Sequence, residues 1–505
     1  MDKGFADDSV VLRMINNSQN ISKEAINQDF VLFGALGDLS LRKILPSFYH
    51  LESHGFLDKS LSIHCAIREE NEIDEFYKRI KESIKKYVQK VDYKEEILET
   101  LTSRINCIAI DLSDSNRYSK IKNSINIDNS STIYYFALPP SMIELVCENL
   151  NSNNLINKKS KIVIEKPIGV DQKSAIEVND KLTKFFDEEQ VYRIDHYLGK
   201  ETVQNLIALR FANSILASQW NSKCIDYVEI TAAETVGIEG RWGYYDDAGQ
   251  MVDMVQSHLL QLLCLIAIEP PNELNALNIR YEKEQLLKAL VPIKDDIIRA
   301  QYSAGEISGK TVPGYLKEEG ANTQSETETY ICMRAEISNW RWAGTPFYLR
   351  TGKRLSEKIT QIIIHFKPEQ HFIFDSDQQH LAGNVLIIKL QPTEGISLEV
   401  VTKNQGIDKG MRLRRDPLHL DFFESQKVSR MPDGYEKMLL ELINSEQRMY
   451  LTRDEVELSW KWCDHVTKTF SDSKQKLCQY KAGSSGPDEA KEMIQKYGHK
   501  WYEDR

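Results

Sequence analysis

Apolar and polar positions follow two different rhythms along this chain, and the change falls near residue 200. In the first part, short apolar runs of strand length are separated by lysine- and glutamate-rich stretches whose apolar residues recur at helical spacing. The apolar runs cover residues 30–33, 61–67, 105–110, 132–138, 161–164 and 190–194, and one helical stretch covers 72–91. Strands that alternate with helices predict an α/β domain built on a Rossmann-like, doubly wound parallel sheet.

After about residue 205, several predicted strands follow one another with short turns and no helix between them. They cover residues 222–235, 327–337, 345–350, 359–366, 384–390 and 396–402, and helical stretches cover 249–268 and 435–443. This pattern predicts an α+β domain with a large, mostly antiparallel sheet. We therefore divide the chain into a flexible N-terminal tail (1–26), a first domain (27–200) and a second domain (201–505).

Composition narrows the class of protein. The chain has 505 residues, too many for one core, and 41% of them are apolar, too many for a disordered chain. A net charge of −11 argues against broad binding to nucleic acid or anionic membranes. The longest mostly apolar stretch, 259–268, is about half of what spanning a bilayer requires, so we expect no membrane helix.

The compartment is inferred from the N-terminus and from the cysteines. The first 26 residues lack the apolar core of a secretory signal. The eight cysteines are scattered along the chain, and no two of them have metal-ligand spacing. We therefore predict a cytoplasmic protein with reduced cysteines.

A glycine-containing turn follows the first predicted strand and precedes a helical stretch at 41–51. Gly34 and Gly37 would let backbone N–H groups approach a diphosphate, and the helix N-terminus would add a favourable dipole. Ser40 replaces the third glycine of the dinucleotide-binding pattern, so an ordinary strand-to-helix turn stays an alternative.

Three more candidates stand at the carboxyl ends of predicted strands, where doubly wound sheets bind ligands. Arg68 suits a ribose 2′-phosphate, although the two glutamates after it also fit a surface charge. Pro139 halts one strand, and Lys166 ends another just before a proline that restricts its backbone. Lys166 is expected to reach into the crevice, unless it is an ordinary solvated lysine.

The run RIDHYLGKE at residues 193–201 lies at the predicted domain junction. It gathers two cations, two carboxylates, an imidazole and a phenol, each costly to bury without a partner. The run therefore predicts a site for a phosphorylated substrate between the domains.

His258 lies in the strongly apolar helical stretch, where it is either a satisfied core residue or a proton acceptor. Asp253 precedes it by five residues, which in an α-helix puts the two about 140° apart. The carboxylate that orients the imidazole is therefore expected from elsewhere, and Asp195 is the candidate. A base at a C–OH group supports hydride abstraction without a metal.

Together these motifs resemble those of the glucose-6-phosphate dehydrogenase family. Besides RIDHYLGKE, the chain contains the family's motifs in order over nearly its whole length. They are GAxGDL (34–39), EKPxG (165–169), E-x5-GRxGYxDxxG (234–249), QxHLLQ (256–261), PFxLRTGKxLxEK (346–358) and AGSSGP (482–487).

The resemblance implies oxidation of the C1 hydroxyl of glucose 6-phosphate to 6-phosphogluconolactone with hydride transfer to NADP, the first step of the oxidative pentose phosphate pathway. The first domain would bind the dinucleotide, and the second would bind substrate and form a homodimer or homotetramer. His258 would be the general base, oriented by Asp195. His196, Tyr197, Lys200 and Lys358 would hold the phosphate, and Lys166, Glu234, Asp253 and Lys353 the sugar hydroxyls. The implied cofactor-binding residues are Gly34, Gly37, Asp38, Leu39, Lys43, Arg68, Pro139 and Lys166. The family also implies a cis Lys166–Pro167 bond.

Four residues depart from the common family pattern: Leu36, Trp242, Ser257 and Lys358. Lys358 stands where some members have arginine and offers a point charge in place of a fork. None of the four removes a catalytic group, so they bear on cofactor affinity and local packing.

Two other functions stay open. The first is a dehydrogenase of unphosphorylated sugars, which the cations His196, Lys200 and Lys358 oppose. The second is a catalytically inactive cofactor sensor, which intact His258 and Asp195 oppose.

Two further signals receive ordinary interpretations. His50 and His54 are spaced like ligands on a helix but lack a third ligand, so no metal site is predicted. Arg412, Arg414 and Arg415 are interpreted as a solvated turn, with a subunit contact as the alternative.

Overall fold

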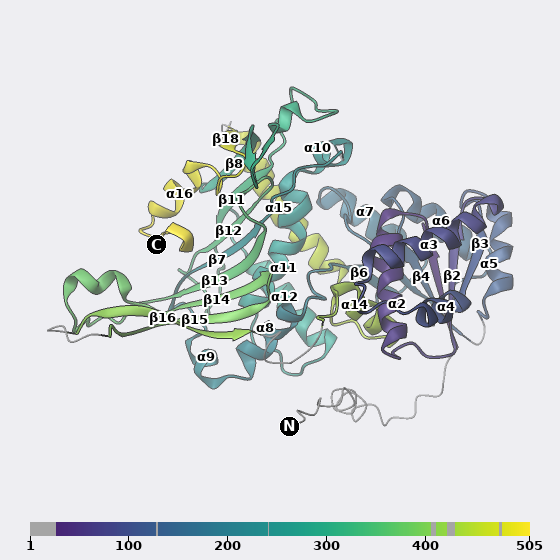
Figure 1. The fold of residues 1–505 in the computed structure, drawn as a ribbon, viewed down its shortest axis with the longest axis horizontal. Helices are drawn as coiled ribbons and strands as arrows, with labels where there is room; N and C mark the ends of the chain where they lie inside the picture. Colours follow the sequence, from purple (N-terminus) through teal and green to yellow (C-terminus); the bar gives the residue numbers. More distant parts are fainter. Residues whose placement is uncertain are drawn as a thin grey trace.

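The computed structural model describes residues 27–127, 130–240, 242–405, 411–421, 430–473 and 477–504. Two lobes lie side by side in it (Figure 1). The predicted tail at 1–26 falls outside the described residues, so its flexibility stays a prediction.

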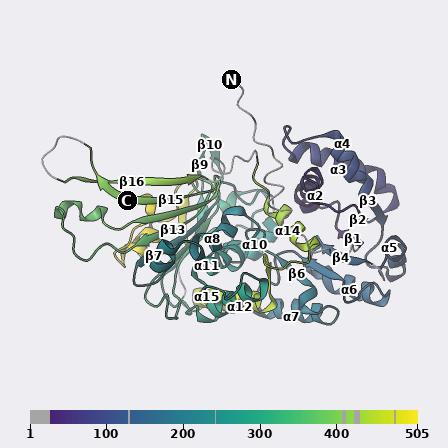
Figure 2. The same ribbon diagram turned by 90° about the horizontal axis from the view of Figure 1, so that it is seen from below.

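The first lobe is built on a seven-stranded sheet in the order β17-β6-β5-β4-β1-β2-β3. The six strands from the first part of the chain are parallel, as the alternating pattern predicted. Because helices cover both faces, β1 and β4 are nearly continuous buried runs. Figure 2 shows α2, α3 and α4 on one face and α6 and α7 on the other. The strands are β1 (Gln28–Phe33), β2 (Leu61–Ile67), β3 (Ile105–Ala109), β4 (Ser131–Phe136), β5 (Lys161–Ile164), β6 (Val191–Ile194) and β17 (Tyr450–Leu451). The helices are α2 (Leu45–Ser53), α3 (Ile73–Tyr87), α4 (Glu95–Arg104), α5 (Ser119–Ser124), α6 (Ile143–Ser152) and α7 (Gln172–Thr183).

The second lobe is built on a nine-stranded sheet in the order β16-β15-β14-β13-β7-β12-β11-β8-β18. Only the β7–β12 and β8–β18 pairs are parallel, so the prediction of a large, mostly antiparallel sheet is confirmed. The strands are β7 (Ile225–Ala233), β8 (Ile297–Ser303), β11 (Tyr330–Ala335), β12 (Phe347–Gly352), β13 (Ile359–Phe366), β14 (Val385–Gln391), β15 (Gly395–Lys403), β16 (Leu413–Asp421) and β18 (Cys478–Lys481), with a separate hairpin of β9 (Gly305–Ile307) and β10 (Lys310–Val312). The helices are α8 (Glu201–Phe211), α9 (Ser214–Gln219), α10 (Trp242–Gln250), α11 (Leu260–Ala267), α12 (Ala276–Ala289), α14 (Gly434–Ile443), α15 (Arg453–Ser473) and α16 (Asp488–Gln495).

The interpretation of the arginine cluster as a solvated turn was wrong. Arg414 and Arg415 lie in β16, which forms the edge of the large sheet, and Arg412 precedes this strand. An edge strand tolerates the charges and the proline that argued against a strand, because one side of its backbone has no ladder partner. Arg415 pairs with Glu399 of the neighbouring β15 at 3.2 Å.

Helices α8, α11, α12 and α15 lie between the large sheet and the first lobe (Figures 1 and 2). The segment Tyr245–Ala267 is long and apolar enough to cross a membrane, but 89% of its most apolar window is buried inside the protein. That burial is typical of a core helix. Its middle part is the π-helix η6 (Met251–Leu259).

The C-terminal part of the chain returns to the first lobe. Strand β17 pairs antiparallel with β6, and α14 packs against α2. The predicted division between residues 200 and 201 falls at the start of α8, while both lobes use residues beyond 430. The end of β6 therefore lies where the first lobe, the second lobe and this returning segment meet.

Candidate active site

The two residues predicted as the catalytic pair contact each other across the lobes. Asp195 directly follows β6, and His258 lies in η6. His258 Nδ1 is 2.6 Å from Asp195 Oδ1, and the backbone N–H of Tyr197 donates to the same oxygen at 3.0 Å. Asp195 is 0% and His258 1% exposed. The carboxylate therefore holds the ring with Nε2 as the nitrogen that accepts a proton.

The expectation that Asp253 and His258 lie on different sides of their helix was wrong. It assumed α-helical spacing, whereas η6 is a π-helix, whose i→i+5 hydrogen bonds bring residues five apart to the same side. Lys166 contacts both: its Nζ donates to the backbone oxygen of Asp253 at 2.8 Å and lies 2.8 Å from Nε2 of His258. The choice of Asp195 as partner still agrees with the observed contact.

The electrostatics around His258 keep its imidazole neutral. Burial lowers its pKa below the ordinary value, and Lys166 adds to this, while Asp195 and Asp253 act in the opposite direction. Burial alone would raise the pKa of Asp195, but attraction to His258 brings that pKa below its usual range. A neutral imidazole beside an ionised carboxylate is the form that a general base requires.

Four charged side chains alternate in sign next to His258. Lys166 Nζ lies 3.7 Å from Asp253 Oδ1, and Lys353 Nζ lies 3.5 Å from Asp253 Oδ2 and 2.7 Å from Glu234 Oε2. The two lysines lower the pKa of Asp253 against the effect of burial. Such a row offers donors and acceptors in turn, which suits the hydroxyls of a sugar. The Lys166–Pro167 bond is cis, as the family resemblance implied.

Lys200 marks a second, cationic end of the site. Its Nζ is buried, has no hydrogen-bond partner among the described residues, and lies 4.1 Å from the ring centre of Tyr197. Burial, partly offset by the carboxylate of Glu394, lowers the pKa of Lys200 to about 8, and the nearby charge of the exposed Lys358 acts in the same direction as burial. A buried ammonium without hydrogen bonds is costly unless a ligand completes it, so this end of the site fits an anion.

The Tyr197 ring lies between the imidazole and this cation, and the His196 ring lies beside Tyr197 and His258. The Tyr197 ring stacks on His258 with centroids 4.0 Å apart, and the His196 ring lies 4.6 Å from His258. Burial brings the pKa of His196 well below its ordinary value. His196 and Tyr197 therefore line the path from the base to Lys200.

Sequence reasoning missed two carboxylates near this path. Glu394 accepts from the backbone N–H of Thr202 at 2.9 Å and caps the start of α8 beside Lys200. Glu165 accepts from Tyr135 at 2.5 Å, and burial raises the pKa of Glu165 to about 7. Glu394 lies in no motif, so no sequence signal pointed to it, whereas Glu165 stands in the EKPxG motif directly before Lys166.

The predicted cofactor turn has the geometry of a tight strand-to-helix connection. Gly34 has φ +77°, and a Cβ there would come within 2.2 Å of the carbonyl oxygen of Ala137, so only glycine fits. Gly37, Asp38 and Leu39 follow at the surface or half-buried. Ser40 is buried and donates to the carbonyl of Gly34 at 2.9 Å, so its hydroxyl supports the turn itself.

Arg68 is exposed just after β2, on the same edge of the sheet as the turn. The glutamates near it are engaged elsewhere: Glu69 and Glu72 cap a short helical turn, and Glu70 pairs with Lys120 at 2.7 Å. Arg68 is thus the cation presented at this strand end.

Two more predicted cofactor residues lie at the same edge. Pro139 is exposed shortly after β4. Lys43 is bound to Asp433, the residue before α14, at 2.7 Å. A phosphate that binds Lys43 must therefore displace this carboxylate.

Within the described ranges, one group of three side chains has ligand atoms close enough for a metal ion: Asp195, His196 and His258. Both ring nitrogens of His258 already have partners, and one partner is the ammonium of Lys166, which opposes a bound cation. His54 Nδ1 lies 2.7 Å from the backbone oxygen of His50. The absence of a metal stays a prediction.

A parallel dinucleotide-type sheet joined to a substrate lobe, with a carboxylate–imidazole pair at the seam, defines a two-domain dehydrogenase. Residues 31–205 match the family model "Glucose-6-phosphate dehydrogenase, NAD binding domain", and residues 207–502 match "Glucose-6-phosphate dehydrogenase, C-terminal domain". The chain belongs to the glucose-6-phosphate dehydrogenase family.

Relatives and solved structures agree with this assignment. The chain is 42% identical over 480 residues to glucose-6-phosphate 1-dehydrogenases of Dickeya dadantii and Rhizobium meliloti, which covers 94% of this chain and 98% and 97% of theirs. It is similar to the structure "Glucose-6-phosphate dehydrogenase in complex with its substrate glucose-6-phosphate", with TM-score 0.85 and 30% identity. The Mycobacterium avium enzyme gives TM-score 0.80 and 30% identity. Each comparison covers 94% of this chain and 98% of the other.

Proposed function

We propose that this protein catalyses the glucose-6-phosphate 1-dehydrogenase reaction, in which the C1 hydroxyl of glucose 6-phosphate is oxidised to 6-phosphogluconolactone with hydride transfer to NADP. The single observation that carries the proposal is the 2.6 Å contact of His258 with Asp195, located at the seam beside the buried ammonium of Lys200. This arrangement puts a base and an anion anchor in one site.

Substrate binding begins at the phosphate. Lys200 supplies the buried charge, and Lys358, His196 and Tyr197 complete the pocket around it. The phosphate dianion restores a partner to an ammonium that burial has destabilised, so part of the binding energy comes from relieving that cost. The sugar ring then lies along the row of Glu234, Lys353, Asp253 and Lys166.

Proton removal follows from the geometry of His258. The C1 hydroxyl takes the place of Lys166 Nζ at Nε2 and gives its proton to that nitrogen as the C1–H bond breaks. Asp195 then faces an imidazolium and stabilises its charge. Lys166 moves to a sugar oxygen, which removes a competing cation from the base.

The first lobe has residues that fit the dinucleotide. When bound, it supplies the hydride acceptor. Gly34 and Gly37 leave backbone space for the diphosphate, and Asp38, Leu39, Lys43 and Pro139 border that space. We propose NADP over NAD because Arg68 is an exposed cation at the strand end where a 2′-phosphate would lie.

We also propose a cytoplasmic homo-oligomer, a dimer or tetramer. None of the eight cysteines forms a disulfide, which agrees with a reducing compartment. Leu418 and Leu420 of the edge strand β16 are 59% and 49% exposed, and a second subunit would bury such a surface.

The test is an absorbance assay for reduced nicotinamide, with glucose 6-phosphate or glucose and with NADP or NAD in turn. We expect turnover with the 6-phosphate and a higher kcat/KM with NADP. Equal rates on glucose and on its 6-phosphate would support a dehydrogenase of unphosphorylated sugars instead. No turnover with any combination would support a cofactor sensor.

A further inference from the structure

Arg193 belongs to the same RIDHYLGKE run as Asp195, yet its side chain binds α7 and the segment before β6. It is 0% exposed in β6. Its Nε donates to Asn179 of α7 at 3.0 Å, and its two NH groups donate to the two carboxylate oxygens of Glu188 at 2.6 and 3.0 Å. A guanidinium two residues before Asp195 is thus held in a bidentate fork, the most directional of side-chain ion pairs.

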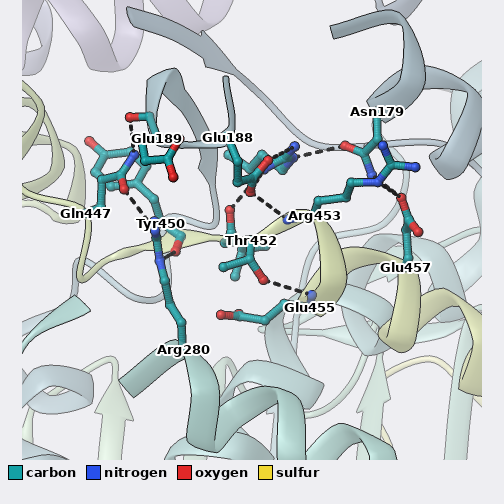
Figure 3. Close-up of polar contacts among 12 residues, drawn as sticks. Asn179, Glu188, Glu189, Arg280, Gln447, Tyr450, Thr452, Arg453, Glu455 and Glu457 are labelled. Carbon is teal, nitrogen blue, oxygen red and sulfur yellow. Dashed lines mark hydrogen bonds and ion pairs between the residues drawn. The ribbon is translucent and has the colours of Figure 1, made fainter. Parts of the chain in front are cut away.

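Glu188 also binds the returning C-terminal segment. Its Oε1, which accepts from Arg193 at 2.6 Å, also accepts from the backbone N–H of Arg453 at 2.9 Å. Arg453 is the first residue of α15. Figure 3 shows Glu188 facing Thr452 and Arg453 at the start of this helix. Just before it, β17 pairs Tyr450 with Ile194 and Leu451 with Arg193. The last residues of β6 are therefore fixed from two sides by the C-terminal segment.

Helix α15 contacts the first lobe along one side. Arg453 donates to Asp180 at 2.6 Å. Asn179 donates to Glu457 at 3.0 Å (Figure 3). Further along, Trp460 Nε1 donates at 2.8 Å to the carbonyl of Ile168, two residues after Lys166. These contacts run from the region of Asp195 to the region of Lys166.

The same helix contacts the second lobe along another side. Glu455 forms a buried ion pair of 2.6 Å with Lys283 of α12, and Trp462 donates to the carbonyl of Val291 at 3.0 Å. Helix α15 also packs against η6, which carries His258. Helix α15 therefore connects the region of β6, which precedes Asp195, with η6, which carries His258.

We propose that Glu188 is a positioning residue of the active site: through Arg193 and the first turn of α15, it sets the distance between Asp195 and His258. This inference rests on the proposed function. The two partners come from different lobes, and a hydrogen bond of this kind weakens steeply over a few tenths of an ångström. Glu188 binds both Arg193 of β6 and the backbone N–H of Arg453 at the start of α15, and it touches neither substrate nor the reacting atoms.

The consequence is a change in basicity. The carboxylate of Asp195 raises the pKa of His258 against burial and Lys166. If the end of β6 relaxes, that support weakens and the pKa of the imidazole falls further. The base then becomes both weaker and less well placed, so kcat falls and the acidic limb of the pH–rate profile moves to lower pH.

The test compares Glu188→Gln with the wild type. The amide keeps the shape of the side chain but removes the charge that binds Arg193. We expect kcat to fall about tenfold, as for a small misplacement of a catalytic group. The acidic limb of kcat/KM for glucose 6-phosphate should move down by about half a pH unit. The KM for the dinucleotide should stay within about twofold, because the turn at Gly34 is remote from Glu188 and its partners Arg193 and Arg453. Glu188→Asp keeps the charge and should recover the position of the limb in part.

The matched control is Glu269→Gln. Glu269 is 42% exposed, close to the 37% of Glu188, and it likewise accepts two bonds from one arginine, Arg341. That pair lies in the second lobe and does not contact β6, so the acidic limb should not move.

Arg453→Gln covers the case in which Glu188→Gln does not fold. It removes the side-chain bond of the partly exposed Arg453 to Asp180, which ties the start of α15 to α7, and it keeps the backbone N–H that donates to Glu188. It should shift the limb in the same direction with a loss in kcat of about threefold. An unmoved limb in folded variants, with rates falling only in proportion to the folded fraction, would overturn the positioning role. A wild type without glucose 6-phosphate oxidation would instead overturn the proposed function.

Discussion

The substrate side and the cofactor side of the junction hold their charges in different ways. On the substrate side, Asp195, His258 and Lys353 are 0%, 1% and 3% exposed and contact one another or their neighbours directly. On the cofactor side, Arg68 is exposed, and the side chain of Lys43 is 39% exposed. Buried charges interact strongly and are little screened by salt, whereas exposed charges are worth little each. Substitutions on the substrate side should therefore change the reaction by orders of magnitude, and those on the cofactor side by smaller factors.

The largest effect is expected at the base. His258→Ala removes the group that accepts the C1 hydroxyl proton, and kcat should fall by at least about a hundredfold. Substrate affinity should stay within a few-fold, because in the proposed site the phosphate is held by Lys200 and not by His258. Steady-state kinetics and equilibrium binding of glucose 6-phosphate measure the two effects separately.

The control for this variant is His54→Ala. His54 is exposed after α2, and its Nδ1 lies 2.7 Å from the backbone oxygen of His50, away from β6 and η6, so the variant should keep full turnover. Wild-type turnover in His258→Ala would refute the assignment of the base.

The next effect concerns pH and the buried ammonium. Lys200 has a pKa lowered to about 8 by burial, so the free protein loses this charge as the pH rises through that value. The substrate phosphate is already a dianion there, since its second pKa is about 6. The KM for glucose 6-phosphate should therefore be flat between about pH 7 and pH 8 and rise toward about tenfold per pH unit above that range.

Two variants isolate the role of Lys200 in this profile. Lys200→Arg keeps its charge over the whole range and should flatten the rise in KM. Lys358→Gln removes an exposed cation and should raise KM at every pH without flattening the profile. A KM that stays constant up to pH 9.5 in the wild type would contradict the role of Lys200 as the anion anchor.

On the cofactor side, Arg68→Ala should separate the two dinucleotides. Loss of an exposed cation that faces a 2′-phosphate should raise the KM for NADP about tenfold and leave that for NAD nearly unchanged. Lys81→Ala, which removes an exposed cation from α3, is the control and should change neither. If the KM values for NADP and NAD rise together in Arg68→Ala, the arginine contributes only a general electrostatic attraction for the dinucleotide and does not select the 2′-phosphate.

How much could be predicted from the sequence also differs between the two sides. The strand-and-helix alternation and the turn after the first strand are local patterns, so the first sheet and the tight turn at Gly34 could be predicted directly. Binding of a diphosphate at this turn stays a prediction. Asp195 was proposed as the partner of His258 partly through α-helical geometry that does not apply, because nothing in the sequence marks η6 as a π-helix.

Contacts between distant segments could not be predicted at all. Asp433 meets Lys43 across 390 residues, and Arg453 meets Glu188 across 265. Strand β17 has two residues, too few for any periodicity, and β16 was missed because its charges and proline resemble a turn. Such features depend on tertiary packing, which overrides local propensity.

The smallest expected effect is a gain on the cofactor side: replacing Asp433, which binds Lys43, should improve the binding of NADP. Asp433 holds Lys43 at 2.7 Å and also accepts from the backbone N–H of Tyr435 at 3.0 Å, which caps α14. Asparagine caps helices as well as aspartate does, so Asp433→Asn removes the charge and keeps the cap. Lys43 is then released toward the cofactor diphosphate, and the KM for NADP should fall by about two- to threefold, as expected for an exposed pair. The gain should vanish at high salt.

Glu436→Gln is the matched control for Asp433→Asn. It removes a carboxylate from the same helical turn, but Glu436 pairs with Arg430 at 2.7 Å, so Lys43 keeps its partner and the KM for NADP should not fall. In the Lys43→Ala background, Asp433→Asn should likewise have no effect on cofactor binding, since the competition it relieves is already gone. Weaker NADP binding in Asp433→Asn alone would mean that the carboxylate orients Lys43 for the cofactor. The Lys43–Asp433 pair on the cofactor side would then be as preorganised as the buried charges on the substrate side.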